Sequence, residues 1–151
     1  MKKVLIAIDY NPVSEKVVDA GYKLAKKMDA EVVLIHVVAD VAYYGVQYPT
    51  FMGYEGFDTS IDLNLATEMQ NVAKNYLETV AKHLNDHSVG TQLRFGDAAD
   101  AILKYAEEWN ADVIVLGTLS HNFLEKLFLG DVASQVLKHS KIPVFMVPAE
   151  K

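Results

Sequence analysis

Continuous apolar runs of strand length alternate with segments of helical periodicity, and this alternation limits the possible folds more than any other feature. Apart from charged residues at their ends, most of the runs are continuously apolar, which is typical of strands buried on both faces of a parallel sheet. We therefore predict an α/β, Rossmann-like fold: a five-stranded, doubly wound parallel sheet in the order 3-2-1-4-5, with two helices on each face. The runs are Lys3–Asp9, Glu31–Val38, Val89–Phe95, Asp112–Leu116 and Val144–Val147.

The segments between the runs carry the apolar spacing of helices. After Asn11, Pro12 suits the first helical position, and Asp97 suits the N-cap of the third helix. The second helix is predicted over Ile61–Asp86. The predicted apolar faces are Val13, Val17, Gly21, Leu24 and Met28; Leu65, Met69, Val72, Tyr76, Val80 and Leu84; Ile102, Leu103, Ala106 and Trp109; and Val132, Val136 and Leu137.

Composition narrows the function classes. The 151 residues suit one domain, 1–151, and contain no cysteine, which excludes disulfides and thiol chemistry. The net charge of −6 argues against nucleic acid as a partner. No apolar run reaches membrane-span length, and the N-terminal run is too short for a signal peptide, so we expect a cytoplasmic protein without a membrane partner.

The stretch from Val113 to Pro148 holds a candidate phosphate cradle. A strand ends at Gly117, and a helix begins near Gly130-Asp131. Glycine allows close backbone approach, and a helix start offers free N–H groups. In a sheet of this order, ligands sit where the winding reverses, between Asp9 after strand one and Gly117 after strand four.

Several stretches resemble one known family. They are KVLIAID at 3–9, His36-Val37, GDAADAI at 96–102 and KIPVFMV at 141–147. With them, the whole chain resembles the universal stress protein family, of the adenine-nucleotide alpha-hydrolase-like superfamily. Nucleotide-binding members carry G-x-x-G, nine residues, then G followed by Ser or Thr, and this chain keeps that register.

The resemblance implies a site for ATP, ADP or AMP, with a divalent cation only if phosphate is bound. Asp9 would meet the ribose or adenine, and Val37 and Leu116 would line the base. His121 could contact a phosphate or simply be solvated. The expected nucleotide-binding residues are Asp9, Pro12, Val37, Leu116, Gly117, Ser120, His121, Gly130, Asp131 and Val132.

Two signature positions differ from the family pattern. Ser120 replaces the second glycine and brings a Cβ. Asp131 replaces the hydroxyl residue, and we expect its carboxylate to cap the last helix, hold the place of the phosphate and repel it. Weak or absent ATP binding is therefore predicted.

Some residues keep two interpretations. Asp9 could be a ligand residue or only a cap of the first helix. For Asp131, a plain N-cap is favoured over a metal or catalytic role. His36 lies within an apolar run, which favours a core histidine with satisfied hydrogen bonds over a ligand.

An enzyme is not the favoured interpretation, because the chain offers no nucleophile–base pair, paired metal-ligand spacing or P-loop lysine. The family resemblance leaves slow ATP hydrolysis open, but that reaction would need the phosphate site altered at Ser120 and Asp131. The main hypothesis is thus a nucleotide crevice with weak or absent ATP binding. One alternative is a dimeric interaction module that binds no nucleotide, and the other is a family member that binds ATP competently. By resemblance, the last strand, Val144, Phe145, Met146 and Val147, would pair with its copy in a homodimer. A loop over 39–59 carries six aromatic residues and could be a lid, a partner surface or a segment packed on the domain.

Overall fold

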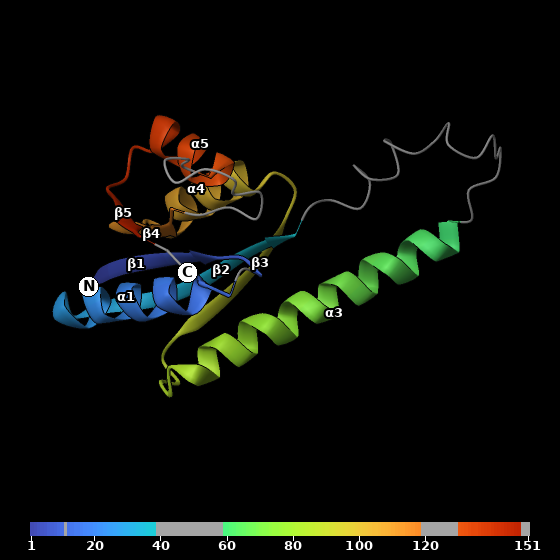
Figure 1. Ribbon diagram of the computed structural model, residues 1–151, viewed down its shortest axis with the longest axis horizontal. Helices are drawn as coiled ribbons and strands as arrows, with labels where there is room; N and C mark the ends of the chain where they lie inside the picture. The colour runs from blue at the N-terminus through green and yellow to red at the C-terminus, as the bar shows by residue number, and fades with distance from the viewer. Residues whose placement is uncertain (11, 39–58, 119–129, 149–151) are drawn as a thin grey trace.

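The predicted alternation of strands and helices is present in the computed structural model (Figure 1), which describes residues 1–10, 12–38, 59–118 and 130–148, with backbone alone for 59–64. The predicted loop over 39–59 lies outside the described residues, except that residue 59 begins a helix. The strands are β1 Lys2–Ile8, β2 Ala30–Val38, β3 Gly90–Phe95, β4 Val113–Gly117 and β5 Val144–Val147. The helices are α1 Ser14–Lys27, α3 Thr59–His83, α4 Ala98–Trp109 and α5 Asp131–His139.

The sheet has five parallel strands in the order β3-β2-β1-β4-β5, as predicted. β1 occupies the centre, where Ile6 pairs with Leu34 of β2 on one side and with Val115 of β4 on the other. Since neighbouring parallel strands end at one edge of the sheet, the residues after β1 and β4 come together there.

Alternate residues of β1 enter two hydrophobic cores. Val4 and Ile6 face α1 and α3, where they pack with Leu77. Leu5 faces α4 and α5, where it packs with Ile102 and with Val136. Two helices therefore cover each face of the sheet, as the pattern predicts (Figure 1).

Gly21 sets how closely α1 approaches the sheet. A Cβ at this position would lie 2.8 Å from Cδ1 of Ile6 and 3.1 Å from Cγ1 of Val115. The helix therefore rests directly on the central strands, and its first turn is held close to the end of β1.

The start of the first helix was predicted wrongly. Pro12 is an exposed turn residue, Val13 is the N-cap, and α1 begins at Ser14. The reason is that the Ser14 hydroxyl is bonded back to Asp9, so the residues between them are needed for a turn.

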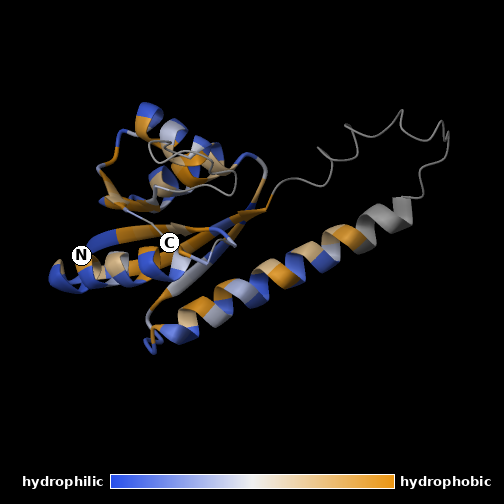
Figure 2. Ribbon diagram, in the orientation of Figure 1, coloured by the Kyte–Doolittle hydropathy of each residue, from blue (hydrophilic) through white to orange (hydrophobic). Residues whose placement is uncertain are grey.

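The apolar face of α3 was predicted only in part. Leu65 and Val72 are 48% and 59% exposed, whereas Ala73 and Leu77 are buried. A helix of 25 residues spans about 37 Å, but the nine residues of β2 span about 30 Å. The helix therefore projects beyond the sheet with apolar residues on the projecting part (Figures 1 and 2).

The apolar face of α5 also differs from the prediction. Val136 is buried as expected, but Val132 and Leu137 are 38% and 43% exposed, and Ala133 is the second buried residue. Ala133 and Val136 are three residues apart and share one side of the helix, which is the side that meets the sheet. Asp97 caps α4 as predicted, since its carboxylate accepts from the Asp100 amide at 3.0 Å.

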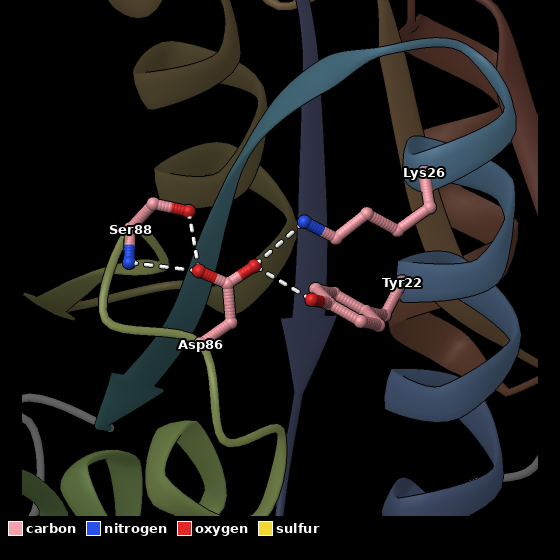
Figure 3. Close-up of polar contacts among 4 residues, drawn as sticks. All are labelled: Tyr22, Lys26, Asp86 and Ser88. Atoms are coloured by element: carbon pink, nitrogen blue, oxygen red, sulfur yellow. Dashed lines mark hydrogen bonds and ion pairs between the residues drawn. The ribbon is translucent and has the colours of Figure 1, made fainter.

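A carboxylate between α3 and β3 ties this connection to α1 (Figure 3). Oδ2 of Asp86 accepts from the Tyr22 hydroxyl at 2.6 Å and from Nζ of Lys26 at 2.7 Å. Oδ1 accepts from the amide and hydroxyl of Ser88 at 2.9 and 2.6 Å. The predicted helix over Ile61–Asp86 ends earlier, at His83, and leaves this carboxylate free to make the bonds.

Among the described residues, no helix combines the length and the apolarity that crossing a membrane requires.

The Asp86 contacts predict a pH-dependent contribution to stability. The bond from Lys26, followed by those from Ser88 and Tyr22, holds the pKa of the Asp86 carboxyl far below its usual range. Because the folded-state pKa is depressed, the stabilisation is complete above the unfolded value of about 3.9 and is lost as the pH falls below it. Asp86→Asn should therefore lower Tm at pH 7, and its difference from wild type should shrink towards pH 3.

Thermal melts followed by circular dichroism at both pH values measure this effect. Glu78→Gln, an exposed change on α3, is the matched control and should follow wild type throughout. Equal Tm values for wild type and Asp86→Asn at pH 7 would contradict the assigned role.

Candidate functional site

A cavity of about 110 Å³ opens at the carboxyl ends of β1 and β4, where the winding of the sheet reverses. The walls come from the ends of β1, β2 and β4 and from the first turns of α1, α4 and α5. The described lining residues are Ala7, Ile8, Asp9, Val13, Ser14, Val17, Ile35, Val37, Ala98, Ile102, Leu116, Gly117, Gly130, Val132 and Ala133.

The cavity walls are mainly aliphatic. Ile35 and Val37 come from β2, Leu116 from β4 and Ile102 from α4. Such walls suit a flat, weakly polar group, and the few polar groups among them would fix its orientation. None of the described lining residues is a lysine or an arginine.

Asp9 is the one carboxylate in the described lining, and Ser14 anchors it. The Ser14 hydroxyl lies 2.9 Å from both the carbonyl oxygen and Oδ1 of Asp9, and its single proton serves one of them at a time. The Asp9 amide donates to Oγ of Ser14 at 3.4 Å. Asp9 therefore lines the cavity and is bonded to Ser14, but it does not cap α1, because the N-cap is Val13 and no side chain caps this helix.

Tyr76 of α3 supports the same turn from the other side, because its hydroxyl donates to the carbonyl of Asp9. Burial is the main cause that raises the pKa of Tyr76; a hydrogen bond with Ser14 acts against it, and the charges of Asp9 and Glu15 add to the rise. The turn after β1 is therefore fixed by two helices.

His36 of β2 lies under this turn, with 3% of its surface exposed. Its Nδ1 is 2.9 Å from the Ile8 carbonyl, which assigns the proton to Nδ1. Nε2 is buried and has no hydrogen-bond partner among the described residues. The prediction of a core histidine is confirmed, but the expected full set of hydrogen bonds is wrong, because the rings of Tyr10 and Tyr76 pack against the imidazole.

The start of α5 corrects the expectation for Asp131. The N-cap is Gly130, with φ −55° and ψ 151°, and no side chain caps this helix. Asp131 is the first helical residue, is exposed and does not line the cavity. The expected cap is therefore wrong, because Gly130 occupies the N-cap position and the Asp131 carboxylate makes no capping hydrogen bond.

The first amides of α5 lie beside the cavity. The first intrahelical bond runs from the Ser134 amide to the Gly130 carbonyl at 2.8 Å. The amides of residues 131–133 therefore precede the helical hydrogen-bond ladder, next to the cavity wall formed by Gly130 and Val132.

The structure brings together six of the ten predicted site residues: Asp9, Val37, Leu116, Gly117, Gly130 and Val132. Pro12 lies instead in a groove between α1 and α3. Ser120 and His121 lie outside the described residues. Sequence reasoning missed Ser14 and the start of α4; a hydroxyl residue five positions after Asp9 was the available signal for Ser14.

No group of three or more metal-binding side chains occurs among the described residues.

Comparison with known proteins gives one consistent result. The sequence profile of the Universal stress protein family matches residues 1–148. The chain is 33% identical to Universal stress protein MJ0531 of Methanocaldococcus jannaschii, over 99% of this chain and 84% of that protein.

Solved structures with similar folds agree. The structure of the hypothetical protein MJ0577 is similar with a TM-score of 0.78 and 25% identity, covering 99% of this chain and 97% of that one. A universal stress protein in complex with cAMP has a TM-score of 0.64 at 18% identity, covering 99% and 98%. One from Archaeoglobus fulgidus in complex with dAMP has 0.54 at 17%, covering 97% of each chain.

The bonds around Ser14 predict a measurable loss on its removal. Ser14→Ala removes the Ser14 hydroxyl bond to Asp9 at a site that is 5% exposed and leaves the Tyr76 bond in place. The loss of one such hydrogen bond costs about 1 kcal/mol, or about 2–4 °C in Tm for a chain of this size. Ser134→Ala on α5 serves as the control in the same thermal melts and should change Tm by less than about 1 °C. An unchanged Tm for Ser14→Ala would rule out this anchoring role.

Proposed function

Since the chain belongs to the universal stress protein family, we propose that the cavity between β1 and β4 binds the adenosine part of an adenine nucleotide. The protein would then act as a regulatory protein of the stress response, and no enzyme activity is assigned to it.

The observation that carries this proposal is an aliphatic cavity with one anchored carboxylate at the switch point of the sheet. An adenine ring fits between Val37 and Leu116, where apolar walls replace water on its faces. Ribose hydroxyls are donors, and Asp9 is the acceptor beside them. The cAMP and dAMP named for two proteins of the same fold support this class of ligand.

The end of the site that would receive the phosphates is less favourable for binding than the adenosine end. The described lining holds no basic side chain, and Asp131 adds a negative charge at the helix start that would receive phosphate. Because this carboxylate is exposed, the high-dielectric value applies, about 1 kcal/mol for two unit charges 4 Å apart. We therefore propose that ATP binds weakly and that ADP and AMP lose less affinity to this repulsion. A divalent cation would bind only together with a phosphate.

Replacement of Asp131 tests this assignment. Asp131→Asn removes the charge and keeps the shape, so ATP should bind about fivefold more tightly, while adenosine should bind equally to both proteins. Isothermal titration calorimetry with chelator present measures both ligands.

Asp100→Asn provides the matched control, because Asp100 is also an exposed acid in a first helical turn, but it lies on α4 and lines a different pocket, away from the start of α5. Tight ATP binding to wild type in chelator would refute the repulsion and favour a competent ATP-binding member. Failure of adenosine and AMP to bind at millimolar concentration would leave the nucleotide-independent interaction module.

We also propose a homodimer through β5. This strand is an edge of the sheet and pairs only with β4, and its Phe145 is 41% exposed. Unpaired backbone groups on an edge strand favour pairing with a second copy, and a two-fold axis closes such a pair. Pro143 and Pro148 would limit the pairing to the residues between them.

Phe145→Lys should shift the dimer to monomer, because it places a charge in the proposed interface without removing a buried core residue. Lys138→Glu, an exposed change on α5, tests for unspecific charge effects. Size-exclusion chromatography with light scattering at about 10–100 μM protein measures the molar mass of each variant in solution. A wild-type monomer at these concentrations would disprove the interface.

The remaining assignments follow from composition and family. We infer a single domain over 1–151 that works in the cytoplasm, without nucleic acid or a membrane as partner. The net charge of −6 supports the absence of a nucleic-acid partner.

A further inference from the structure

We propose that the groove between α1 and α3 is a second binding site, separate from the nucleotide cavity, for a small organic cation of the alkylammonium class. This α1/α3 groove has a volume of about 250 Å³ and is lined chiefly by Tyr10, Pro12, Glu15, Val18, Tyr76 and Val80. None of these residues lines the cavity between β1 and β4.

Two aromatic rings form one wall of the groove. The rings of Tyr10 and Tyr76 lie with centroids 5.0 Å apart and are tilted by 53°, so that together they form a corner. Aromatic faces attract cations, most strongly where water is partly excluded, and aromatic cages for methylated ammonium groups use this attraction.

Both rings are held in place before any ligand arrives. The Tyr76 hydroxyl donates to the Asp9 carbonyl. Tyr10 packs edge-on against the buried imidazole of His36, with a centroid distance of 4.5 Å, and that imidazole is fixed by Ile8. A ligand therefore does not need to order these side chains, which lowers the entropic cost of binding.

The charges around the groove favour a cation over a neutral ligand. Glu15 lines the groove and forms no ion pair with any described residue. Burial is the main cause that raises the pKa of Tyr76, and the negative charges of Asp9 and Glu15 add to the rise. His83 also lines the groove, and its Nε2 lies 3.5 Å from Oδ1 of Asp19.

The site has the size and mixed character of a pocket for a small ligand. Val80 supplies apolar surface for methyl groups, and Val18 lies fully buried beneath the groove. Thr79 also lines the groove, and its hydroxyl donates to the Asn75 carbonyl at 2.8 Å. A trimethylammonium group carries three methyl groups around one positive charge and matches both features.

Choline is the probe, and 3,3-dimethylbutan-1-ol is its neutral counterpart of the same shape. Each is titrated at about pH 8 into the full chain without nucleotide, with chemical-shift changes of the tyrosine rings as the readout. Choline should bind saturably and at least about tenfold more tightly than the alcohol, with shifts centred on Tyr10 and Tyr76.

Single substitutions separate the contribution of the Tyr10 ring to choline binding from that of the Glu15 charge. Tyr10→Leu should weaken choline binding by about 2- to 30-fold, whereas Tyr10→Phe keeps an aromatic face and should stay within about twofold of wild type. Glu15→Gln should weaken binding up to about fivefold, and Glu107→Gln, the same change on the exposed side of α4, should have no effect. Circular dichroism melts confirm that each variant is folded.

Three results would overturn the proposal: no saturation up to about 50 mM choline, equal affinity for choline and the alcohol, or unchanged choline binding in folded Tyr10→Leu. Adenosine is titrated into the same variants as a separate measurement. Its result tests the cavity between β1 and β4, and the choline result tests the α1/α3 groove.

Discussion

Burial of β1 on both faces is the constraint on which the rest of the structure depends. Val4, Leu5 and Ile6 have no exposed surface, because α1 and α3 cover one side of the strand and α4 and α5 the other. A strand of this kind must be central, and parallel winding outward from it in both directions leaves a gap at its carboxyl end. The position of Asp9 opposite Gly117 is thus a consequence of hydrophobic burial several residues earlier.

The turn after β1 connects two regions that the sheet would otherwise separate. Asp9 lines the cavity on one side, and the next residue, Tyr10, lines the α1/α3 groove on the other. Ser14 and Tyr76 bind this turn from two helices, so a shift of the backbone at Asp9 would move groups in both places. Any free energy that couples two ligands through this turn would be reciprocal, as binding linkage requires.

The sequence predicts the fold well and the details of the helices less well. Strand order, both core layers and the Asp97 cap follow from local patterns, because apolar runs and capping residues act within a few positions. The errors arise where contacts between distant parts of the chain determine the structure. The Ser14 hydroxyl is bonded to Asp9 at the start of α1. α3 extends beyond the sheet, and Leu65, in its N-terminal part, is 48% exposed. Ser14 and Ile102 reach the cavity from two separate helices. No single sequence motif contains both residues, so the sequence did not predict their place in the site.

At the proposed nucleotide site, the change to Asp131 would weaken phosphate binding by degrees instead of abolishing it. Gly130 supplies the extended backbone that the helix start needs, so α5 forms without a side-chain cap and the family fold survives the substitution. The carboxylate lies at the positive end of the helix, where the dipole stabilises it. The same field would otherwise favour phosphate, so the substitution partly cancels the attraction of the helix start for an anion. Since the Asp131 side chain is exposed, water and salt screen what repulsion remains. The apolar walls of the cavity do not depend on the residue at position 131, because they come from β2, β4 and α4. If the crevice binds a nucleotide as proposed, its affinity would depend more on the adenosine part of the ligand than on its phosphates.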